Sequence, residues 1–465
     1  MSRIHEHHDA PILAELAART VQARTGAIPQ AAGHAANRAL VDWYAAAVSG
    51  GVEPPARILS EVVLAESVAG HSCVVPSGRA VPARPAALIN ATAAHTTEID
   101  DIFRDGMYHP GAPTIAAALA VAEEVNASGA DLLRAIVLGF EVGCRLAQAV
   151  APSHYRFWHP TGTIGALGAT VAAADLYDLD ADRLTHALAT ATTMAAGLQQ
   201  AFRGESMSKP LHAGRAAETG VFAAATAARG FTGTAGAFDG EAGLAAAMSA
   251  DADLSVAARS FGEPFAVGSI TVKNHACCGH TFAAVDAALE LRSAFPDLRD
   301  IERIEIDTYR AATITAGHPR PETAFEAKFS LAYCVAAALG LGTVRAAAFE
   351  PSALADPLLR RLVERTVVRV DGRYEKLAPN RRAARVTVSG ENNGRRSAER
   401  LTRRGDPDEP LSDAELSDKF VEFTQPVLGG TAARDLLARA WRVSSLRHVR
   451  DLNRLPASTE NRVIT

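Results

Sequence analysis

Alanine constrains the fold of this chain more than any other feature. About a fifth of the 465 residues are alanine, and between residues 10 and 250 they recur with other apolar residues at three- and four-residue spacing. Alanine is the strongest helix former, and its small side chain lets helices approach closely. The segments with this spacing are Arg38–Val48, Thr114–Val125, Asp131–Val150, Arg183–Gln199 and Gly214–Ala228. We therefore predict an all-helical domain.

The pattern changes near residue 265. Apolar and polar residues alternate over Ile301–Tyr309, Thr366–Val370 and Ala384–Ser389, as in half-buried strands, and Asn393-Gly394 is a strong hairpin signal. Helical spacing separates these strands and returns after Asp413. We predict a mainly α protein, with a large all-helical domain and a smaller α+β lid domain inserted before C-terminal helices. The expected boundaries are 1–267 for the first part of the helical domain, 268–410 for the lid, and 411–465 for the C-terminal helices that pack back.

Charge and composition exclude several classes of protein. The net charge of −5 argues against a nucleic-acid partner, which would require a dense basic face. Charged residues or histidine interrupt every apolar stretch before the roughly 18 residues needed to cross a membrane, and the first residues lack the apolar core of a signal peptide. We expect a cytoplasmic protein without a membrane partner. The five cysteines contain no Cys-x-x-Cys pair, so the ligand spacing of a zinc ribbon or a conventional iron–sulfur cluster is absent. We expect a protein without a bound metal or another cofactor.

Polar residues that interrupt the apolar segments are candidates for chemistry. Glu98, Asp100 and Asp101 crowd three carboxylates into four residues, with His95 before them and His109 after them. Such crowding raises carboxyl pKa values into a range useful for proton transfer, or binds a cation. A metal set of Glu98, Asp100, Asp101 and His109 is one alternative. The other is a solvated turn in which an aspartate caps a helix.

The other candidates are scattered along the chain. His159 stands at an expected helix start, where it could bind an anion or move a proton, and Lys209 precedes a proline and a helix. His275 lies near Cys277 at the expected domain junction, and Tyr333 is on an apolar helix. Each also has a purely structural interpretation, as a buried histidine, a solvent-directed lysine or a core tyrosine.

In chain order these motifs resemble those of a known family. The most specific are Lys209-Pro210-Leu211-His212 and Lys328-Phe329-Ser330. The sequence is similar over nearly its whole length to the MmgE/PrpD family, which includes 2-methylcitrate dehydratase, cis-aconitate decarboxylase and iminodisuccinate epimerase. The resemblance implies a helical domain made from both chain ends, a lid, a homodimer and a site at the junction. Two residues depart from the usual family pattern, namely Glu98 and Ile102.

The resemblance also implies a cofactor-free lyase acting on a small anionic substrate, a di- or tricarboxylate. The first expectation is a 2-methylcitrate dehydratase-like hydro-lyase. An epimerase or isomerase, a cis-aconitate decarboxylase-like carboxy-lyase and a catalytically silent polycarboxylate-binding paralogue are the alternatives. The family pattern places the catalytic residues at Glu98, Asp100, Asp101, His109, His159, Lys209, His275 and Tyr333. In this interpretation His159, Lys209 and His275 hold carboxylates, His109 or the acidic cluster exchanges protons, and Tyr333 donates a hydrogen bond.

Overall fold

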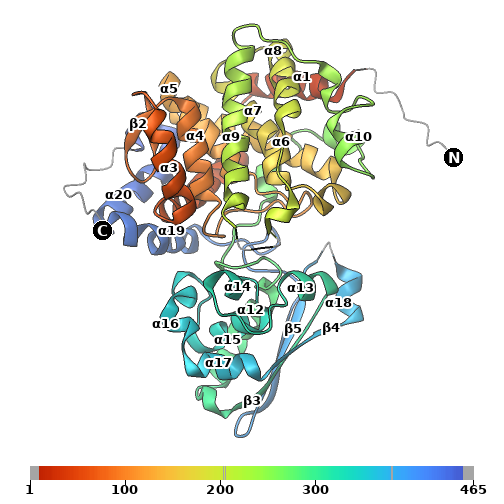
Figure 1. Cartoon of the computed structure of the whole chain (residues 1–465), viewed down its shortest axis with the longest axis vertical. Coiled ribbons are helices and arrows are strands. Elements are labelled where there is room, and N and C mark those ends of the chain that lie inside the picture. Colours follow the sequence, from red (N-terminus) through yellow and green to blue (C-terminus); the bar gives the residue numbers. More distant parts are fainter. Residues whose placement is uncertain (1–9, 203, 205, 379–380, 454–465) are drawn as a thin grey trace, which may run out of the picture. The chain divides into compact units, whose positions relative to one another are not determined.

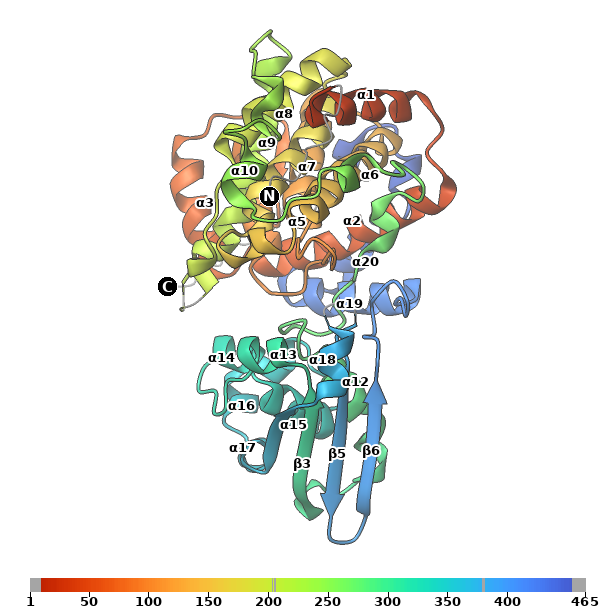
Figure 2. The ribbon, with the colours of Figure 1, turned by 90° about the vertical axis from the view of Figure 1, so that its right-hand side faces the viewer.

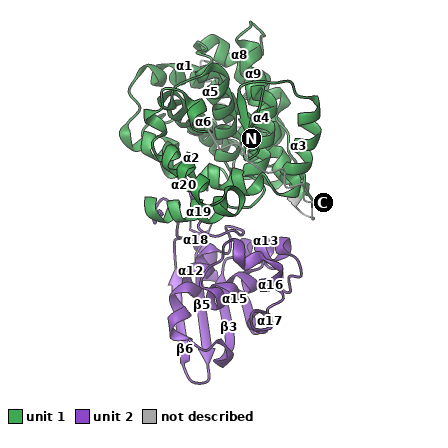
Figure 3. Cartoon of the chain, turned by 90° about the vertical axis from the view of Figure 1, so that its left-hand side faces the viewer, with its two compact units in different colours: residues 1–270, 412–465 green, residues 271–411 purple. Residues whose placement is uncertain are grey.

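The chain folds into two compact units. The computed structural model describes residues 10–202, 204, 206–378 and 381–453. One unit comprises Met1–Ile270 together with Ser412–Thr465, and the other comprises Thr271–Leu411 (Figure 3). The fold is 60% helix and 9% strand, which confirms the prediction of a mainly α protein.

The first unit is a bundle of helices. Its helices are α1 (Ile12–Thr25), α2 (Gln30–Gly50), α3 (Pro54–Glu66), α4 (Ala83–Ala94), α5 (Gly111–Val125), α6 (Gly129–Val150), α7 (Pro160–Leu176), α8 (Ala181–Met194), α9 (Ser208–Ala227), α10 (Leu244–Met248), α11 (Ser255–Ala258), α19 (Asp413–Leu428) and α20 (Gly430–Trp441) (Figure 1). No described helix is both long and apolar enough to cross a lipid bilayer.

Helix α7 forms the centre of this bundle. Every residue from Pro160 to Asp175 is buried, as expected for a helix that is apolar all round, and α7 packs against α5, α6, α8 and α9. Glycine makes this packing possible. A Cβ on Gly220 of α9 would lie 2.6 Å from the carbonyl carbon of Ala169 on α7. The two backbones therefore approach more closely than any side chain allows.

The C-terminal helices belong to the first unit. Helix α19 packs beside α2 (Figure 2), and the buried ammonium of Lys419 donates to Asp42 Oδ1 at 2.6 Å and to the Ile99 carbonyl at 2.7 Å. Asn37 of α2 donates to the carbonyl of Trp441 at the end of α20. The first unit is thus assembled from residues that lie hundreds of positions apart in the sequence.

The all-helical description of the first unit omits one short sheet. Strands β1 (Ser72–Val74) and β2 (Arg79–Val81) form an antiparallel pair between α3 and α4. The buried carboxylate of Glu123 on α5 accepts a 2.7 Å hydrogen bond from the backbone N–H of Cys73 in this pair. Burial raises the pKa of Glu123 to about 7.

The second unit packs helices against a four-stranded sheet. The strand order is β4 (Thr366–Val370), β3 (Ile301–Thr308), β5 (Ala384–Gly390) and β6 (Gly394–Arg400), and only the β3–β4 pair is parallel (Figure 2). The Asn-Gly signal indeed marks the β5–β6 hairpin. The helices are α12 (Phe282–Leu291), α13 (Arg310–Thr315), α14 (Ala324–Lys328), α15 (Leu331–Leu341), α16 (Pro351–Leu354), α17 (Pro357–Glu364) and α18 (Gly372–Leu377).

Candidate functional site

Four helix ends in the first unit bring the candidate residues together. His95 caps the C-terminus of α4, and His109 stands immediately before Pro110, the N-cap of α5. His159 is the N-cap of α7, and Lys209 lies in the first turn of α9. The loop that carries the acidic residues is folded back on itself, because Phe103 and Tyr108 exchange backbone hydrogen bonds of 2.7 and 3.1 Å.

Asp100 is the centre of this cluster. Its buried Oδ2 lies 2.6 Å from Nδ1 of His95 and 3.1 Å from Nδ1 of His109. The first contact is a regular hydrogen bond, whereas the second is an electrostatic contact outside regular hydrogen-bond geometry. One carboxylate therefore orients two imidazoles, and it favours a proton on the Nδ1 of each.

The cluster keeps His95 uncharged. Its side chain is fully buried, and burial lowers its pKa to about 4 even though Asp100 opposes that shift. Near neutral pH its ring is a neutral imidazole that donates to Asp100. It packs edge to face against His109, with ring centroids 4.9 Å apart, and stacks on His159 at 5.3 Å.

His159 is held by its backbone and by a second histidine. Its N–H donates to the Gly197 carbonyl at 2.9 Å, and its Nδ1 lies 3.1 Å from Nδ1 of His212 on α9. Burial lowers the pKa of His159 well below its usual value and also lowers that of His212. One neutral ring must donate and the other accept, so each fixes the tautomer of its partner.

Lys209 forms an ion pair with Glu98. Both side chains are mostly buried, with exposed fractions of 15% and 14%. Glu98 has a φ of 63°, in the left-handed region that residues other than glycine seldom adopt. The ammonium group expected to meet a substrate carboxylate therefore already faces a carboxylate of the protein.

Asp101 has a different environment from Asp100. Its Oδ1 accepts a 2.9 Å hydrogen bond from the N–H of Gly111 at the start of α5. Burial, followed by the neighbouring charges of Asp100 and Asp42, raises the pKa of Asp101 well above its usual value. These influences favour a neutral carboxylic acid. Its contact with Gly111 positions the loop, and its neutral form limits repulsion in the cluster.

The structure thus brings six of the eight predicted residues into one cluster. These are Glu98, Asp100, Asp101, His109, His159 and Lys209. The other two belong to the second unit. There, Nε2 of His275 lies 2.8 Å from Asp286 Oδ1, and the buried Tyr333 hydroxyl donates to the Ala348 carbonyl at 2.6 Å. The single proton of Tyr333 is already engaged, which favours a structural role for this tyrosine.

Sequence reasoning did not assign four residues that shape the cluster. The motifs contain His95 and His212 but do not predict a role for either. Asp42 and Lys419 were overlooked, although their pair supports the loop through the carbonyl of Ile99, next to Asp100. The signal for Asp42 was a single acid within the apolar segment Arg38–Val48.

The structure groups a different set of possible metal ligands from the Glu98, Asp100, Asp101 and His109 set suggested by the sequence. Among the described residues, one donor atom each from His95, Asp100 and His109 lie within 4.8 Å of one another. Glu98 instead pairs with Lys209, and Asp101 binds Gly111. Asp100 already contacts both imidazoles, through a hydrogen bond to His95 and an electrostatic contact with His109, and these two contacts account for the closeness of the three groups.

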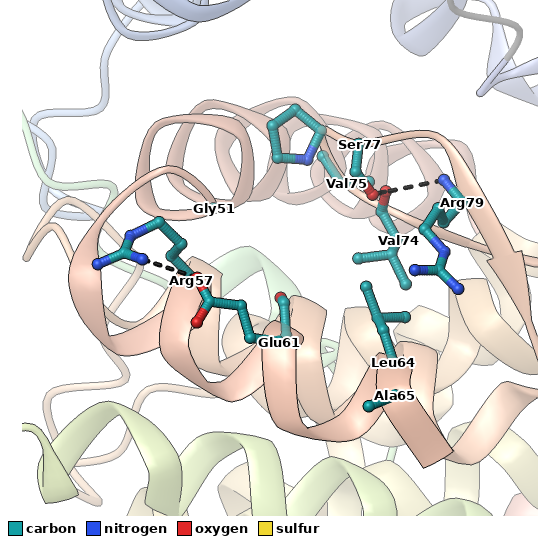
Figure 4. A pocket seen from close by; sticks show the side chains of 11 residues that line it. Gly51, Arg57, Glu61, Leu64, Ala65, Val74, Val75, Ser77 and Arg79 are labelled. Atoms are coloured by element: carbon teal, nitrogen blue, oxygen red, sulfur yellow. Dashed lines mark hydrogen bonds and ion pairs between the residues drawn. The ribbon is translucent and has the colours of Figure 1, made fainter. Parts of the chain in front are cut away.

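A separate pocket lies between α3 and the β1–β2 pair (Figure 4). It encloses about 460 Å³, and its lining includes Leu64, Val74 and Arg79. Its carboxylate, on Glu61, forms a 2.7 Å ion pair with Arg57. None of the predicted site residues lines this pocket, so the histidine and aspartate cluster is the stronger candidate for proton transfer.

Two family models, for the two domains of one family, match successive parts of the chain. Residues 14–257 match the MmgE/PrpD N-terminal domain, and residues 275–442 match the MmgE/PrpD C-terminal domain. The chain is 26% identical over 450 residues to the cis-aconitate decarboxylase-like protein oryM of Aspergillus oryzae, covering 90% of this chain and 91% of that protein.

Two further relatives are named cis-aconitate decarboxylase. The protein from Aspergillus terreus is 25% identical over 323 residues, covering 64% of this chain and 66% of its own length. The protein from Homo sapiens is 34% identical over 151 residues, which is 31% of either chain.

Proposed function

Because the chain belongs to the MmgE/PrpD family, we propose that it is a lyase acting on a small di- or tricarboxylate by side-chain acid–base chemistry. The observation that carries this proposal is the buried Asp100 carboxylate, which contacts two imidazoles beside the Glu98–Lys209 ion pair. The first candidate reaction is dehydration, as in a 2-methylcitrate dehydratase-like hydro-lyase.

His109 is the proposed base. Asp100 contacts its Nδ1, which leaves the lone pair of Nε2 available to accept a proton from a carbon next to a substrate carboxylate. Hydrogen bonds of catalytic groups often become shorter and better aligned when a substrate binds, so we expect the 3.1 Å contact between Asp100 and His109 to become a regular hydrogen bond in the complex. The His109 side chain is 15% exposed, compared with 3% for Asp100, so it is the accessible member of the pair.

Lys209 and His159 are the proposed carboxylate-binding groups. Removing the proton places negative charge on an enolate-like carboxylate, and cationic or hydrogen-bonding groups aimed at that oxygen stabilise it. In the dehydration, the C–O bond of a neighbouring hydroxyl breaks, its electron pair leaves with oxygen, and an acid supplies the proton that completes water. The products are water and an alkene.

Decarboxylation is the second candidate. The relatives named cis-aconitate decarboxylase favour it. In that reaction a C–C bond breaks, CO₂ leaves, and the electron pair remaining on carbon accepts a proton from the enzyme. The same cluster could supply that proton, with His109 acting as an acid in place of a base.

One experiment separates the candidate reactions. The protein is incubated in D₂O with citrate-, methylcitrate-, aconitate- and aspartate-like acids, and proton NMR follows each acid. A new alkene signal from a citrate- or methylcitrate-like acid indicates dehydration, a product with one carboxyl group fewer together with release of CO₂ indicates decarboxylation, and solvent exchange without net loss indicates epimerisation or isomerisation. We expect dehydration, and we expect His109→Gln to abolish it while His71→Ala, at an exposed histidine of the same unit, does not. Binding of an acid without any of these changes would favour the alternative of a catalytically silent polycarboxylate-binding protein.

A further inference from the structure

The charges of the cluster restrict the anions that it can accept. Lys209 faces Glu98, and Lys419 faces Asp42, so each ammonium group already contacts a carboxylate of the protein. Asp100 contributes another carboxylate, whose described contacts are with histidines. Burial disfavours the charged forms of His95 and His159, so these rings do not offset the negative charge at neutral pH. This part of the molecule therefore does not present a surplus of positive charge.

Glu98 is held in place by its surroundings. A glutamate with φ of 63° occupies a backbone conformation that is unfavourable for an L residue, and such conformations persist only where neighbouring contacts enforce them. Here the side chain is mostly buried and its carboxylate meets the ammonium of Lys209, which comes from a helix 111 residues later. The contact thus links the aspartate-rich loop to the first turn of α9.

We propose that Glu98 is a specificity-determining residue, because its carboxylate takes one donor position of the Lys209 ammonium and leaves that ammonium to one substrate carboxylate rather than two. The substrate class that fits is a dicarboxylate, and a tricarboxylate is disfavoured. This inference rests on the proposed function, since it concerns the same site. A third carboxylate would either compete with Glu98 for Lys209 or remain unpaired in a largely buried site, where an unpaired charge is costly.

The test compares the affinities of two unreactive acids. Succinate serves as the dicarboxylate and tricarballylate as the tricarboxylate, and isothermal titration calorimetry measures both affinities for the full chain. We expect the unaltered protein to bind succinate at least tenfold more tightly. Glu98→Gln removes the competing charge and keeps the side-chain shape, so we expect it to tighten tricarballylate binding about tenfold, equivalent to about 1.4 kcal/mol.

Two variants serve as controls. Glu98→Asp keeps the charge, so it should retain the preference for succinate, and Glu66→Gln removes an exposed carboxylate elsewhere in the first unit and should change neither affinity. Thermal melting confirms that each variant is folded, and Glu98→Ala replaces Glu98→Gln if the latter is not.

The outcomes separate this inference from the proposed function. A succinate-to-tricarballylate ratio that stays within twofold in Glu98→Gln, a preference of the unaltered protein for tricarballylate, or failure of both proteins to bind either acid overturns the specificity role. Absence of turnover in the NMR experiment, together with the expected shift in this ratio, overturns the lyase proposal and leaves the role of Glu98 supported.

Discussion

At the scale of single residues, the cluster places chemically similar groups in different environments. Asp100 contacts two imidazoles, whereas the neighbouring Asp101 is buried against a backbone N–H and has a raised pKa. His95 has a pKa of about 4, while His109 is the more accessible ring. Different environments of this kind give chemically similar side chains separate roles as acid and base.

Lys209 and His159 provide the most direct test of the proposed carboxylate-binding groups. We expect Lys209→Ala and His159→Ala each to reduce turnover of the true substrate at least tenfold, because a charged or buried hydrogen-bonded contact contributes about 1.5 kcal/mol or more. Steady-state kinetics with the substrate found by NMR measures the effect. Turnover within threefold of the unaltered protein in both variants would place the binding groups elsewhere.

Asp101 should produce a pH dependence of stability. Its pKa is raised in the folded protein, so above about pH 4 the folded state keeps a proton that the unfolded chain has released. The free energy of unfolding therefore falls as pH rises through that range. Asp101→Asn mimics the protonated acid and cannot titrate, so we expect a smaller fall between pH 4 and pH 8. Urea denaturation at a series of pH values measures it, and parallel curves for the two proteins would contradict the assignment.

At the scale of elements, the position of the aspartate-rich loop depends on the C-terminal helix α19. Lys419, with a side chain only 1% exposed, contacts both Asp42 and the carbonyl of Ile99. We expect Lys419→Met to lower the free energy of unfolding by about 3–5 kcal/mol, because it leaves the carboxylate of Asp42 buried without this partner. Chemical denaturation checks this value.

The double variant Asp42→Leu with Lys419→Met is the matched control. It removes both charges, so we expect it to recover part of the lost stability, while the Ile99 carbonyl still lacks its donor. If the double variant is less stable than Lys419→Met alone, burial of the charge is not the cause.

The close approach of α7 and α9 gives a second test at this scale. A methyl group on Gly220 would lie 2.6 Å from the Ala169 carbonyl carbon and 2.7 Å from the Thr170 nitrogen. We expect Gly220→Ala to cost about 1–3 kcal/mol of stability, since backbone atoms cannot yield as a flexible side chain can. Gly33→Ala on α2, where a Cβ meets no atom within 4 Å, should instead be neutral or stabilising. Thermal melting of both variants compares them, and equal shifts would argue against close helix packing.

Helices and strands were predicted correctly where residues close together in the sequence determine them. Helix α6 begins at Gly129, where Ser128 and Asp131 form a reciprocal cap, and three- and four-residue spacing indicated its remainder. Strand β3 was predicted from the alternation of apolar and polar residues, and its burial follows that alternation. In contrast, β1 and β2 have only three residues each, which is too short for a recognisable alternation. Strand β6 is an exposed, charged edge strand, so its sequence shows no hydrophobic pattern.

At the scale of the whole molecule, the sequence could not reveal contacts between distant segments. His159 and His212 are 53 residues apart, and Asp42 and Lys419 are 377 apart, so no local spacing joins them. The acids and histidines of the site were identified as polar interruptions of apolar segments, and the resemblance to a family pattern joined them into one predicted site. The engagement of Lys209 by Glu98 depends on the folded backbone and could not be predicted from either residue alone.

The division into two units predicts the course of thermal unfolding. Each unit buries its own apolar core, so we expect differential scanning calorimetry to resolve two transitions rather than one. Lys419→Met should lower the temperature of only the transition that belongs to the first unit. A single transition that shifts as a whole would show that the units unfold cooperatively.

The return of α19 and α20 to the first unit has a consequence for biosynthesis. Asp42 leaves the ribosome early, yet its partner Lys419 is translated only after the entire second unit. The second unit is continuous in sequence and can fold while translation proceeds, whereas the nascent helices of the first must wait for their last members. During that interval the surface of α2 that α19 later covers is exposed to solvent and to chaperones, so slower translation of the intervening segment prolongs the vulnerable stage.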